Sequence, residues 1–338
     1  GIMYRLIRRA ALMLWRSKGK ASDICRMLLE DFKLEQKNVD QKADQYPWVR
    51  KPGTVLPEEI IRNGIPFLSF PMLEETGLVV QGFTTRMGGV SKGCFASMNL
   101  SFTRGDDEAD VRENHRLAAE ALGYDWKRAI LTHQTHTDNI LVVTEADAGK
   151  GITKEKGYTG IDGLMTNTPG VALIAFGADC VPLYFLDPVR KVIALVHSGW
   201  RGTVQEIGPK AVQMMQDIYG SDPQDILACI GPSICGDCYE VGAEVADVFC
   251  EKFSQAEAER IVWGNANGRY QLDLWRANEL LLEKAGILKE HMQVTGICTR
   301  CNPELLFSHR KMGNARGNLS AILCLKEAQP QEQGYKES

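Results

Sequence analysis

Long hydrophobic runs and an excess of basic charge are both missing from this sequence of 338 residues. No stretch approaches the roughly 18 uninterrupted apolar residues of a membrane-spanning helix, so we expect no membrane partner. The chain has 39 Lys and Arg against 43 Asp and Glu, a net charge of −4, and the two signs are mixed along it. Nucleic-acid binding is typical of a clustered basic face, so we expect no nucleic-acid partner.

Cysteine, in contrast, is abundant, with 10 residues. Disulfide frameworks are typical of short secreted proteins, so in a chain of this length the cysteines are better explained as reduced thiols. We therefore expect a reducing compartment, the cytoplasm. Hydrophobic residues make up 44% and charged residues 24% of the chain, which is ordinary for a globular protein. We expect a monomer or a weak dimer.

The composition changes twice along the chain and predicts three segments. Residues 1–58 combine a basic amphipathic helix with a polar, proline-rich linker, and are predicted to be an N-terminal appendage. Residues 59–326 are predicted to be the folded body. Residues 327–338 are too polar to pack and are predicted to be a disordered tail.

Short β-rich runs alternate with helical patterns in the body, which predicts an α+β domain. The predicted helices each precede a glycine suited to a left-handed C-cap, and Thr203 and Glu206 have the spacing of a capping box. The predicted strands are 79–85, 140–143, 171–176, 182–186 and 192–196, and the predicted helices are 107–122, 203–219 and 275–285.

A predicted β-hairpin around Asp187-Pro188 brings a cysteine and a histidine together. If Asp187 pairs with Arg190, the same register places Cys180 directly opposite His197. Opposed residues have Cβ atoms about 4.5–5.5 Å apart, which suits a thiolate and an imidazole that share one zinc ion. A third ligand can come from His133 or His136, just before the strand at 140–143.

Two histidines and one cysteine leave a fourth coordination position open, as in a catalytic zinc site. The competing explanation is that Cys180 is a small core residue and His197 a hydrogen-bonded histidine at a strand end. Arg201 lies between glycines beside a predicted helix N-terminus, which suits either an anion site or a surface salt bridge.

An ordered set of motifs from about residue 65 to 325 resembles the YfiH-like family, also called laccase-domain or multicopper-polyphenol-oxidase-like proteins. The motifs that carry the resemblance are Gly82-Phe-Thr-Thr-Arg-Met-Gly-Gly-Val-Ser, Ser97-Met-Asn-Leu, Gln134-Thr-His136, Asp162-Gly, Ala178-Asp-Cys180, His197-Ser-Gly-Trp-Arg-Gly, Gly231-Pro-Ser-Ile and Tyr239-Glu-Val-Gly.

The resemblance implies a single α+β domain of β-sandwich-like mixed sheets flanked by helices, with zinc in a cleft. It implies that His136, Cys180 and His197 are the metal ligands. The implied activity is phosphorolysis of adenosine, inosine and methylthioadenosine, with adenosine deamination as a side activity. The implied substrates are therefore a purine nucleoside and phosphate.

Predicted roles follow for further residues. The predicted catalytic residues are the three ligands and Arg201. The predicted substrate contacts are Arg86, Asn99, Arg201 and Arg310, of which the arginines suit phosphate or ribose because phosphorolysis needs cationic donors. Asp179, beside Cys180, is suited either to orienting a ligand or moving a proton, or to a capping role. The motif Asn314-Ala-Arg-Gly departs from the usual Gly-Arg pair of the family, which leaves the roles of Arg310 and Arg316 open.

Two other activities compete with phosphorolysis. One is copper-dependent polyphenol oxidation, with Cu²⁺ in place of Zn²⁺; the chain's 6 histidines form no His-x-His pair, which argues against a blue multicopper laccase. The other is a cysteine hydrolase, or editing of peptidoglycan precursors, with Cys180 as nucleophile and His197 as base.

A non-enzymatic alternative concerns two other cysteine pairs, Cys235-Gly-Asp-Cys238 and Cys298-Thr-Arg-Cys301. They suit a structural zinc clamp in a binding module. Their separation is far longer than the usual spacing of roughly 15–20 residues, so reduced thiols in loops are the competing explanation.

Overall fold

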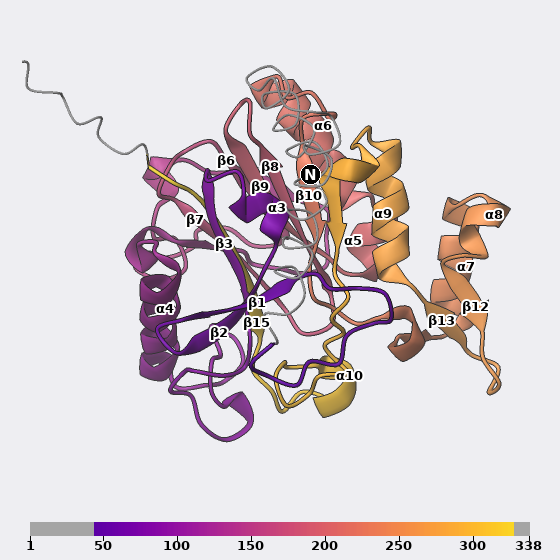
Figure 1. Ribbon diagram of the computed structural model, residues 1–338, viewed down its shortest axis with the longest axis horizontal. Helices are drawn as coiled ribbons and strands as arrows, with labels where there is room; N and C mark the ends of the chain where they lie inside the picture. The colour runs from indigo at the N-terminus through magenta and orange to yellow at the C-terminus, as the bar shows by residue number, and fades with distance from the viewer. Residues whose placement is uncertain (1–43, 328–338) are drawn as a thin grey trace, which may run out of the picture. The chain divides into compact units, whose positions relative to one another are not determined.

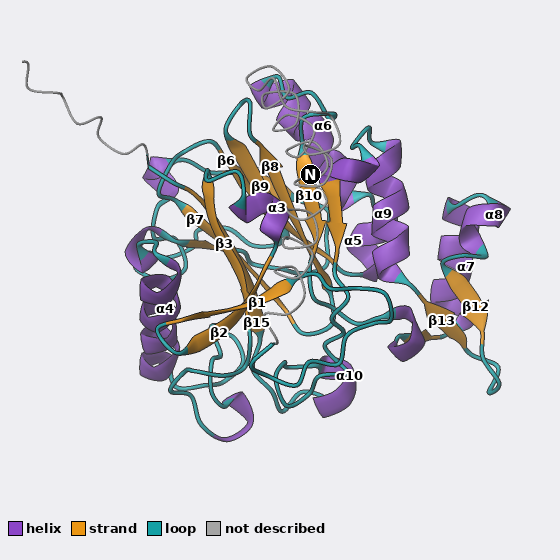
Figure 2. Cartoon of the chain, viewed as in Figure 1, coloured by secondary structure: helices purple, strands orange, loops and turns teal. Residues whose placement is uncertain are grey.

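Two six-stranded mixed sheets form the centre of the molecule in the computed structural model, which describes residues 44–327 (Figure 1, Figure 2). The first sheet has the order β1 (Glu58–Arg62), β2 (Ile65–Ser69), β3 (Val79–Thr84), β15 (Leu319–Leu325), β7 (Ala172–Gly177) and β4 (Ile130–Leu131). The second has the order β14 (Met292–Val294), β10 (Leu227–Ile230), β8 (Val181–Asp187), β9 (Val192–Ser198), β6 (Gly163–Thr166) and β5 (Ile140–Val142).

The two sheets pack face to face, because β7 and β15 of the first contact β9 of the second. Every residue of β8, β9 and β15 is buried, which explains why these strands are almost continuously apolar in sequence. Tyr184 of β8 crosses the interface and donates its hydroxyl to the Gly82 carbonyl of β3 at 3.1 Å. The predicted α+β class with sandwich-like sheets is confirmed.

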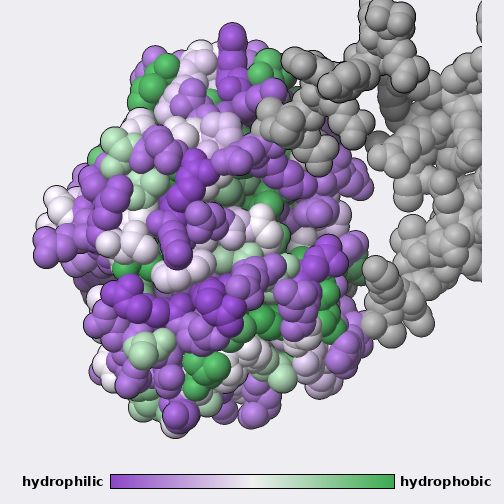
Figure 3. All heavy atoms as spheres, turned by 90° about the vertical axis from the view of Figure 1, so that its left-hand side faces the viewer, coloured by the Kyte–Doolittle hydropathy of each residue, from purple (hydrophilic) through white to green (hydrophobic). Residues whose placement is uncertain are grey.

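Helix α4 (Glu108–Leu122) contacts the first sheet at β3, and its bounds match the prediction closely. Asp107 caps its N-terminus by accepting hydrogen bonds from Ala109 and Asp110, and Gly123 ends it with φ +90°. Its outer face carries ion pairs between Arg and Glu, such as Arg112 with Glu108. Figure 3 shows that the surface on this side is mainly hydrophilic, with small scattered hydrophobic groups.

Helices α6 (Ile207–Tyr219) and α9 (Leu274–Lys284) cover the second sheet at β9 and β10. The predicted capping box is wrong. A short helix α5 (Trp200–Val204) begins directly after Gly199, so Thr203 is already inside it and donates its hydroxyl to the Gly199 carbonyl. The chain then breaks at Glu206, which has φ +62° and makes no side-chain cap, before α6 begins.

A third, smaller sheet has the order β11 (Glu240–Val241), β13 (Tyr270–Leu272) and β12 (Val262–Gly264). Helix α7 (Ala243–Lys252) packs on it and is followed by α8 (Gln255–Ala258), at the right of Figure 1. Two short helices, α3 (Pro71–Glu74) and α10 (His309–Met312), complete the α-helices of residues 44–327.

The predicted hairpin exists, but its register was wrong by two positions. Asp187 pairs with Val192, not Arg190, so Pro182 and not Cys180 lies opposite His197. The turn is longer because the Asp187 side chain accepts hydrogen bonds from the backbone N–H groups of Val189 and Arg190, and Lys191 takes a left-handed conformation. Cys180 therefore lies just before β8, diagonal to His197.

The predicted terminal segments fall mostly beyond the described region. The amphipathic helix and most of the tail lie outside residues 44–327, so the domain boundaries stay predictions. Val49 already contacts the body, because its N–H donates to Asn302, and Arg50 forms a bridge with Ile297. Within the described region, no helix has both the length and the apolar character needed to cross a membrane.

Candidate metal centre and cleft

Three predicted ligands converge at one end of the second sheet. His136 lies in the loop between β4 and β5, Cys180 directly precedes β8, and His197 belongs to β9. One ligand atom from each lies within 4.8 Å of the others. The two imidazole rings are 5.0 Å apart and nearly perpendicular, at 71°. His133, the other histidine considered, bridges to Ile161 and accepts a hydrogen bond from the Gly160 N–H, so it is not part of this cluster.

Asp162, just before β6, holds both histidines in place. Its carboxylate accepts a hydrogen bond from His197 Nδ1 at 2.8 Å and from the backbone N–H of His136 at 3.1 Å. The N–H groups of Thr135 and Thr137 also donate to it, each at 3.0 Å. A carboxylate on one ring nitrogen of a ligating histidine fixes the tautomer and leaves the other nitrogen free for a metal.

These contacts change the pKa values of the cluster. Burial favours the neutral form of Asp162, but the hydrogen bonds from His197 and the backbone prevail and lower its pKa to about 2. Burial by itself lowers the pKa of His197, whereas Cys180 and Asp162 together raise it to about 9. For His136, burial and the neighbouring His197 lower the pKa. Asp162 is therefore an anion throughout the neutral range.

The backbone around the three ligands has unusual conformations at two residues and a close approach at a third. His136 and Asp179 both have left-handed conformations, with φ of +63° and +101°. Gly199, which follows β9, lies so close that a Cβ atom there would be 2.9 Å from His136 Nδ1 and 3.3 Å from Cys180 Sγ. A glycine is therefore required at this position by close approach, since its own φ of −67° is ordinary.

The cluster lies in a cleft of about 670 Å³. Most of its charged lining is cationic: Arg104, Lys156, Arg310 and Arg316 face a single carboxylate, Asp179. Aromatic side chains line the same cleft, namely Phe102, Phe176, Trp200 and Tyr239. The arrangement suits a ligand that has both an anionic group and a flat ring.

Arg316 is the most buried of these cations. Its side chain hydrogen-bonds to the Gly317 carbonyl and to Asn318, while its buried Nε has no partner among the described residues. Burial, with the nearby Arg104 adding to it, lowers the pKa of Arg316 to about 10. It remains charged at neutral pH and retains an unused donor.

Of the predicted catalytic and substrate residues other than the three ligands, Arg310 lines the cleft and Arg201, Arg86 and Asn99 do not. Arg310 lines the cleft, and its backbone N–H donates to Asp179 at 2.6 Å. Arg201 is exposed, stacks on Trp200 with its guanidinium 4.3 Å from the ring centre, and is not part of the cleft lining. Arg86 and Asn99 are not brought to the cleft.

Arg86 is bonded away from the cleft, whereas Asn99 lies just behind its wall, where its side chain bonds to Ser101 and Asn318 of the lining. Arg86 donates to the carbonyls of Ala96 and Pro303. Asn99 is fully buried and donates to Asp106 and to the Ser101 carbonyl.

Sequence reasoning missed three residues of the site. Asp162 belongs to one of the family motifs, but the sequence alone assigns it no role. Its position could have indicated one, because it directly precedes Gly163 of β6, the strand that pairs with β9. No motif in the sequence includes Arg104 or Lys156. Both lie in irregular segments without a periodic pattern, so no signal in the sequence places them beside the cluster.

Comparison with known proteins decides the family. Residues 80–326 match the family model described as multi-copper polyphenol oxidoreductase laccase. The chain belongs to this laccase-domain, YfiH-like family. The predicted resemblance is therefore confirmed.

Relatives of this laccase-domain chain have enzyme names. It is 38% identical over 251 residues to purine nucleoside phosphorylase YlmD of Bacillus subtilis, covering 74% of this chain and 90% of that one. It is 34% identical over 237 residues to adenosine deaminase RL5 from an unknown prokaryotic organism, covering 69% and 89%. The crystal structure of YlmD from Geobacillus stearothermophilus matches 83% of this chain and all of its own, with a TM-score of 0.73 and 34% identity.

Proposed function

We propose that this protein is a zinc-dependent purine nucleoside phosphorylase that cleaves adenosine, inosine and methylthioadenosine with phosphate. The observation that carries the proposal is the cationic, aromatic-lined cleft with His136, Cys180 and His197 in its wall. Relatives named as purine nucleoside phosphorylases support it. No cysteine of the described region forms a disulfide, which agrees with the reducing cytoplasm that we propose.

The three side chains fit zinc. Two imidazoles and one thiolate are ligands that zinc prefers, and three protein ligands leave a position for substrate or water. Asp162 supplies the carboxylate that commonly orients a ligating histidine. A bound zinc ion would supply Lewis acidity at the wall of the cleft. Cu²⁺ would also bind such a donor set, so a polyphenol oxidase activity would be expected only after metal replacement.

The residues of the cleft have separate tasks in phosphorolysis. Arg104, Arg310 and Arg316 line the cleft, and we assign them to phosphate because guanidinium groups donate paired hydrogen bonds to its oxygens. Tyr239 and Trp200 each have a guanidinium over one ring face, that of Arg310 and that of Arg201, so a purine would stack on the other face. Exclusion of water from a half-enclosed site strengthens each of these electrostatic contacts.

The decisive experiment incubates the protein with each nucleoside, with and without phosphate, and separates the products. Phosphate-dependent release of free base together with ribose 1-phosphate is expected. Arg316→Ala is expected to raise the KM for phosphate about 10-fold or more and the KM for nucleoside much less, because it removes a buried cation. Arg260→Ala, an exposed arginine outside the cleft lining, is the matched control. Base release that is independent of phosphate would contradict the proposal.

Adenosine deamination is the second candidate. Its supporting observations are the named deaminase relative and Asp179, whose carboxylate lies in the cleft beside Cys180. Asp179 is already bonded through both oxygens, to the Thr299 hydroxyl and the Arg310 N–H, each at 2.6 Å. Conversion of adenosine to inosine without phosphate is the expected sign of this activity. A cysteine hydrolase that uses Cys180 and His197 would instead keep its activity after chelation.

A further inference from the structure

Two cysteine-containing loops, far apart in the sequence, meet beside Asp179: the Ile234 N–H of one donates to the Asp179 carbonyl, and the Thr299 hydroxyl of the other donates to the Asp179 carboxylate. Residues 231–238 follow β10 and residues 295–301 follow β14, and these two strands are parallel neighbours. The pairing continues past the strands as a bridge between Ser233 and Cys298. Parallel neighbours deliver their following loops to the same edge of a sheet, which explains how a separation of 63 residues closes to direct contact.

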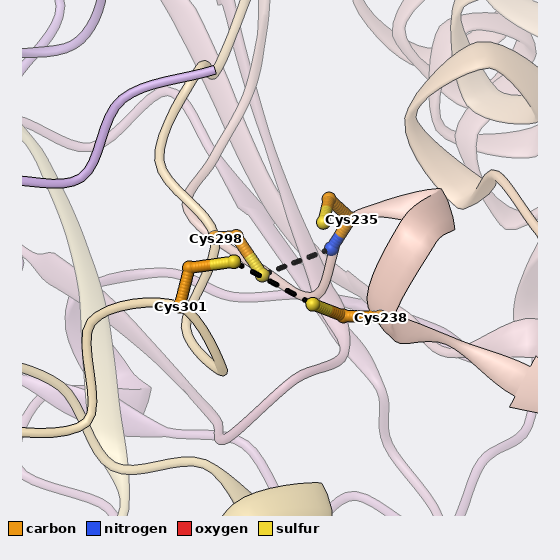
Figure 4. A group of neighbouring side chains, drawn as sticks. All are labelled: Cys235, Cys238, Cys298 and Cys301. Atoms are coloured by element: carbon orange, nitrogen blue, oxygen red, sulfur yellow. Dashed lines mark hydrogen bonds between the residues drawn. The ribbon is translucent and has the colours of Figure 1, made fainter.

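Four sulfur atoms point into the space between these loops (Figure 4). Those of Cys235, Cys238, Cys298 and Cys301 all lie within 4.8 Å of one another, and the Cys238 and Cys301 sulfurs are 3.5 Å apart. In a tetrahedral zinc site with Zn–S bonds of about 2.3 Å, the sulfurs are about 3.8 Å apart. A disulfide needs about 2.05 Å. The observed spacing is thus close to that of one shared ion.

The surroundings of the four sulfurs suit an anionic centre. Four thiolates with one Zn²⁺ have a net charge of −2, and two cations lie near them. The Lys51 ammonium, which is also paired with Asp237, interacts with Cys235, and the Arg300 guanidinium interacts with Cys238. The backbone N–H of Cys235 donates to the Cys298 sulfur at 3.3 Å. Donors of this kind stabilise metal-bound thiolates in the second coordination shell.

We propose that Cys235, Cys238, Cys298 and Cys301 bind one structural zinc ion, separate from the His136, Cys180 and His197 centre. With all four positions filled by protein ligands, this ion has no place for substrate. It fastens together two loops that shape the cleft. Thr299, between the last two cysteines, donates to Asp179, and Tyr239, which follows Cys238, packs 5.1 Å below the Arg310 guanidinium.

The test is metal analysis of the purified full chain by mass spectrometry, together with variants that isolate each site. Wild type is expected to hold two zinc ions per chain. Cys180→Ala is expected to retain one, and the double variant Cys238→Ser with Cys301→Ser is also expected to retain one. Cys250→Ser, an exposed cysteine outside both clusters, is the matched control and should keep both.

Cobalt substitution gives a readout that does not depend on how the double variant folds. Cys180→Ala loaded with Co²⁺ is expected to show the strong thiolate-to-metal charge transfer of a four-sulfur tetrahedral site. The proposal would be overturned if Cys180→Ala contained no metal, or if the intact mass of the purified protein showed two disulfides. If the protein contained iron in place of zinc, the metal assignment would be overturned. None of these results depends on whether the protein cleaves nucleosides, so this inference and the proposed function fail separately.

Discussion

The substitution Gly199→Ala tests the metal centre through a single methyl group. Backbone strain is not expected, because Gly199 has φ −67° and ψ 175°, which alanine adopts readily. The added Cβ would lie 2.9 Å from His136 Nδ1, whereas ordinary contacts begin at 3.4 Å, so the ring must retreat by about 0.5 Å. Metal–ligand distances tolerate only about 0.2 Å, so the ring cannot stay in a good coordinating position.

We expect zinc affinity to fall about 10- to 100-fold, or roughly 1.4–2.7 kcal/mol, similar to the loss of an outer-shell partner. The assay is competition with a chromophoric chelator at fixed pH, in the Cys238→Ser and Cys301→Ser background so that only this centre is measured. Gly177→Ala is the matched control, because its Cβ would meet its nearest atom at an ordinary 3.4 Å. Unchanged zinc affinity in Gly199→Ala would refute the reasoning that His136 and Cys180 converge beside this glycine.

Two further predictions concern buried polar groups. Asp162→Asn is expected to weaken zinc binding about 10- to 100-fold in the same competition assay, because a neutral amide cannot serve His197 and three backbone N–H groups as the carboxylate does; equal affinity would show that Asp162 is not an orienting group. His115 is fully buried, and burial lowers its pKa to about 4, below the roughly 6.5 of an unfolded histidine. As the pH falls, His115 is therefore protonated in the unfolded state before it is protonated in the folded state. This difference should lower the free energy of unfolding by about 2 kcal/mol between pH 7 and pH 5. Urea unfolding of wild type and His115→Gln at both pH values checks this, and an equal pH dependence in the two proteins would contradict it.

Local signals in the sequence predicted the ends of a helix well where the capping interactions lie within the helix's own first and last turns. Asp107 and Gly123 bound α4 closely because a carboxylate cap and a left-handed glycine act within one turn of the chain. The same type of signal failed at Thr203, since the residues after Gly199 were already helical and the buried Thr203 hydroxyl bonds to Gly199 and Ser198 instead of capping. The tertiary contacts of the buried Thr203 therefore outweighed the local capping signal.

The candidate centre was reached partly through a wrong register. Cys180 and His197 do converge, but as diagonal neighbours, because the turn at Asp187 is longer than two residues. What the sequence could not provide was the arrangement of irregular segments. Arg104 and Arg316 reach the cleft on loops whose paths depend on contacts with each other, such as the hydrogen bond from Arg104 Nε to the Arg316 carbonyl at 3.3 Å.

Since one carboxylate ties the His136 backbone and the His197 ring, the two imidazoles cannot be adjusted independently. A displacement of the Asp162 carboxylate would act on the His136 backbone and the His197 ring at the same time. An inhibitor that pushes on His136 alone would therefore be resisted by the whole hydrogen-bonded assembly around Asp162. Redesign of this centre for another metal would have to begin at Asp162, with the ligands changed afterwards.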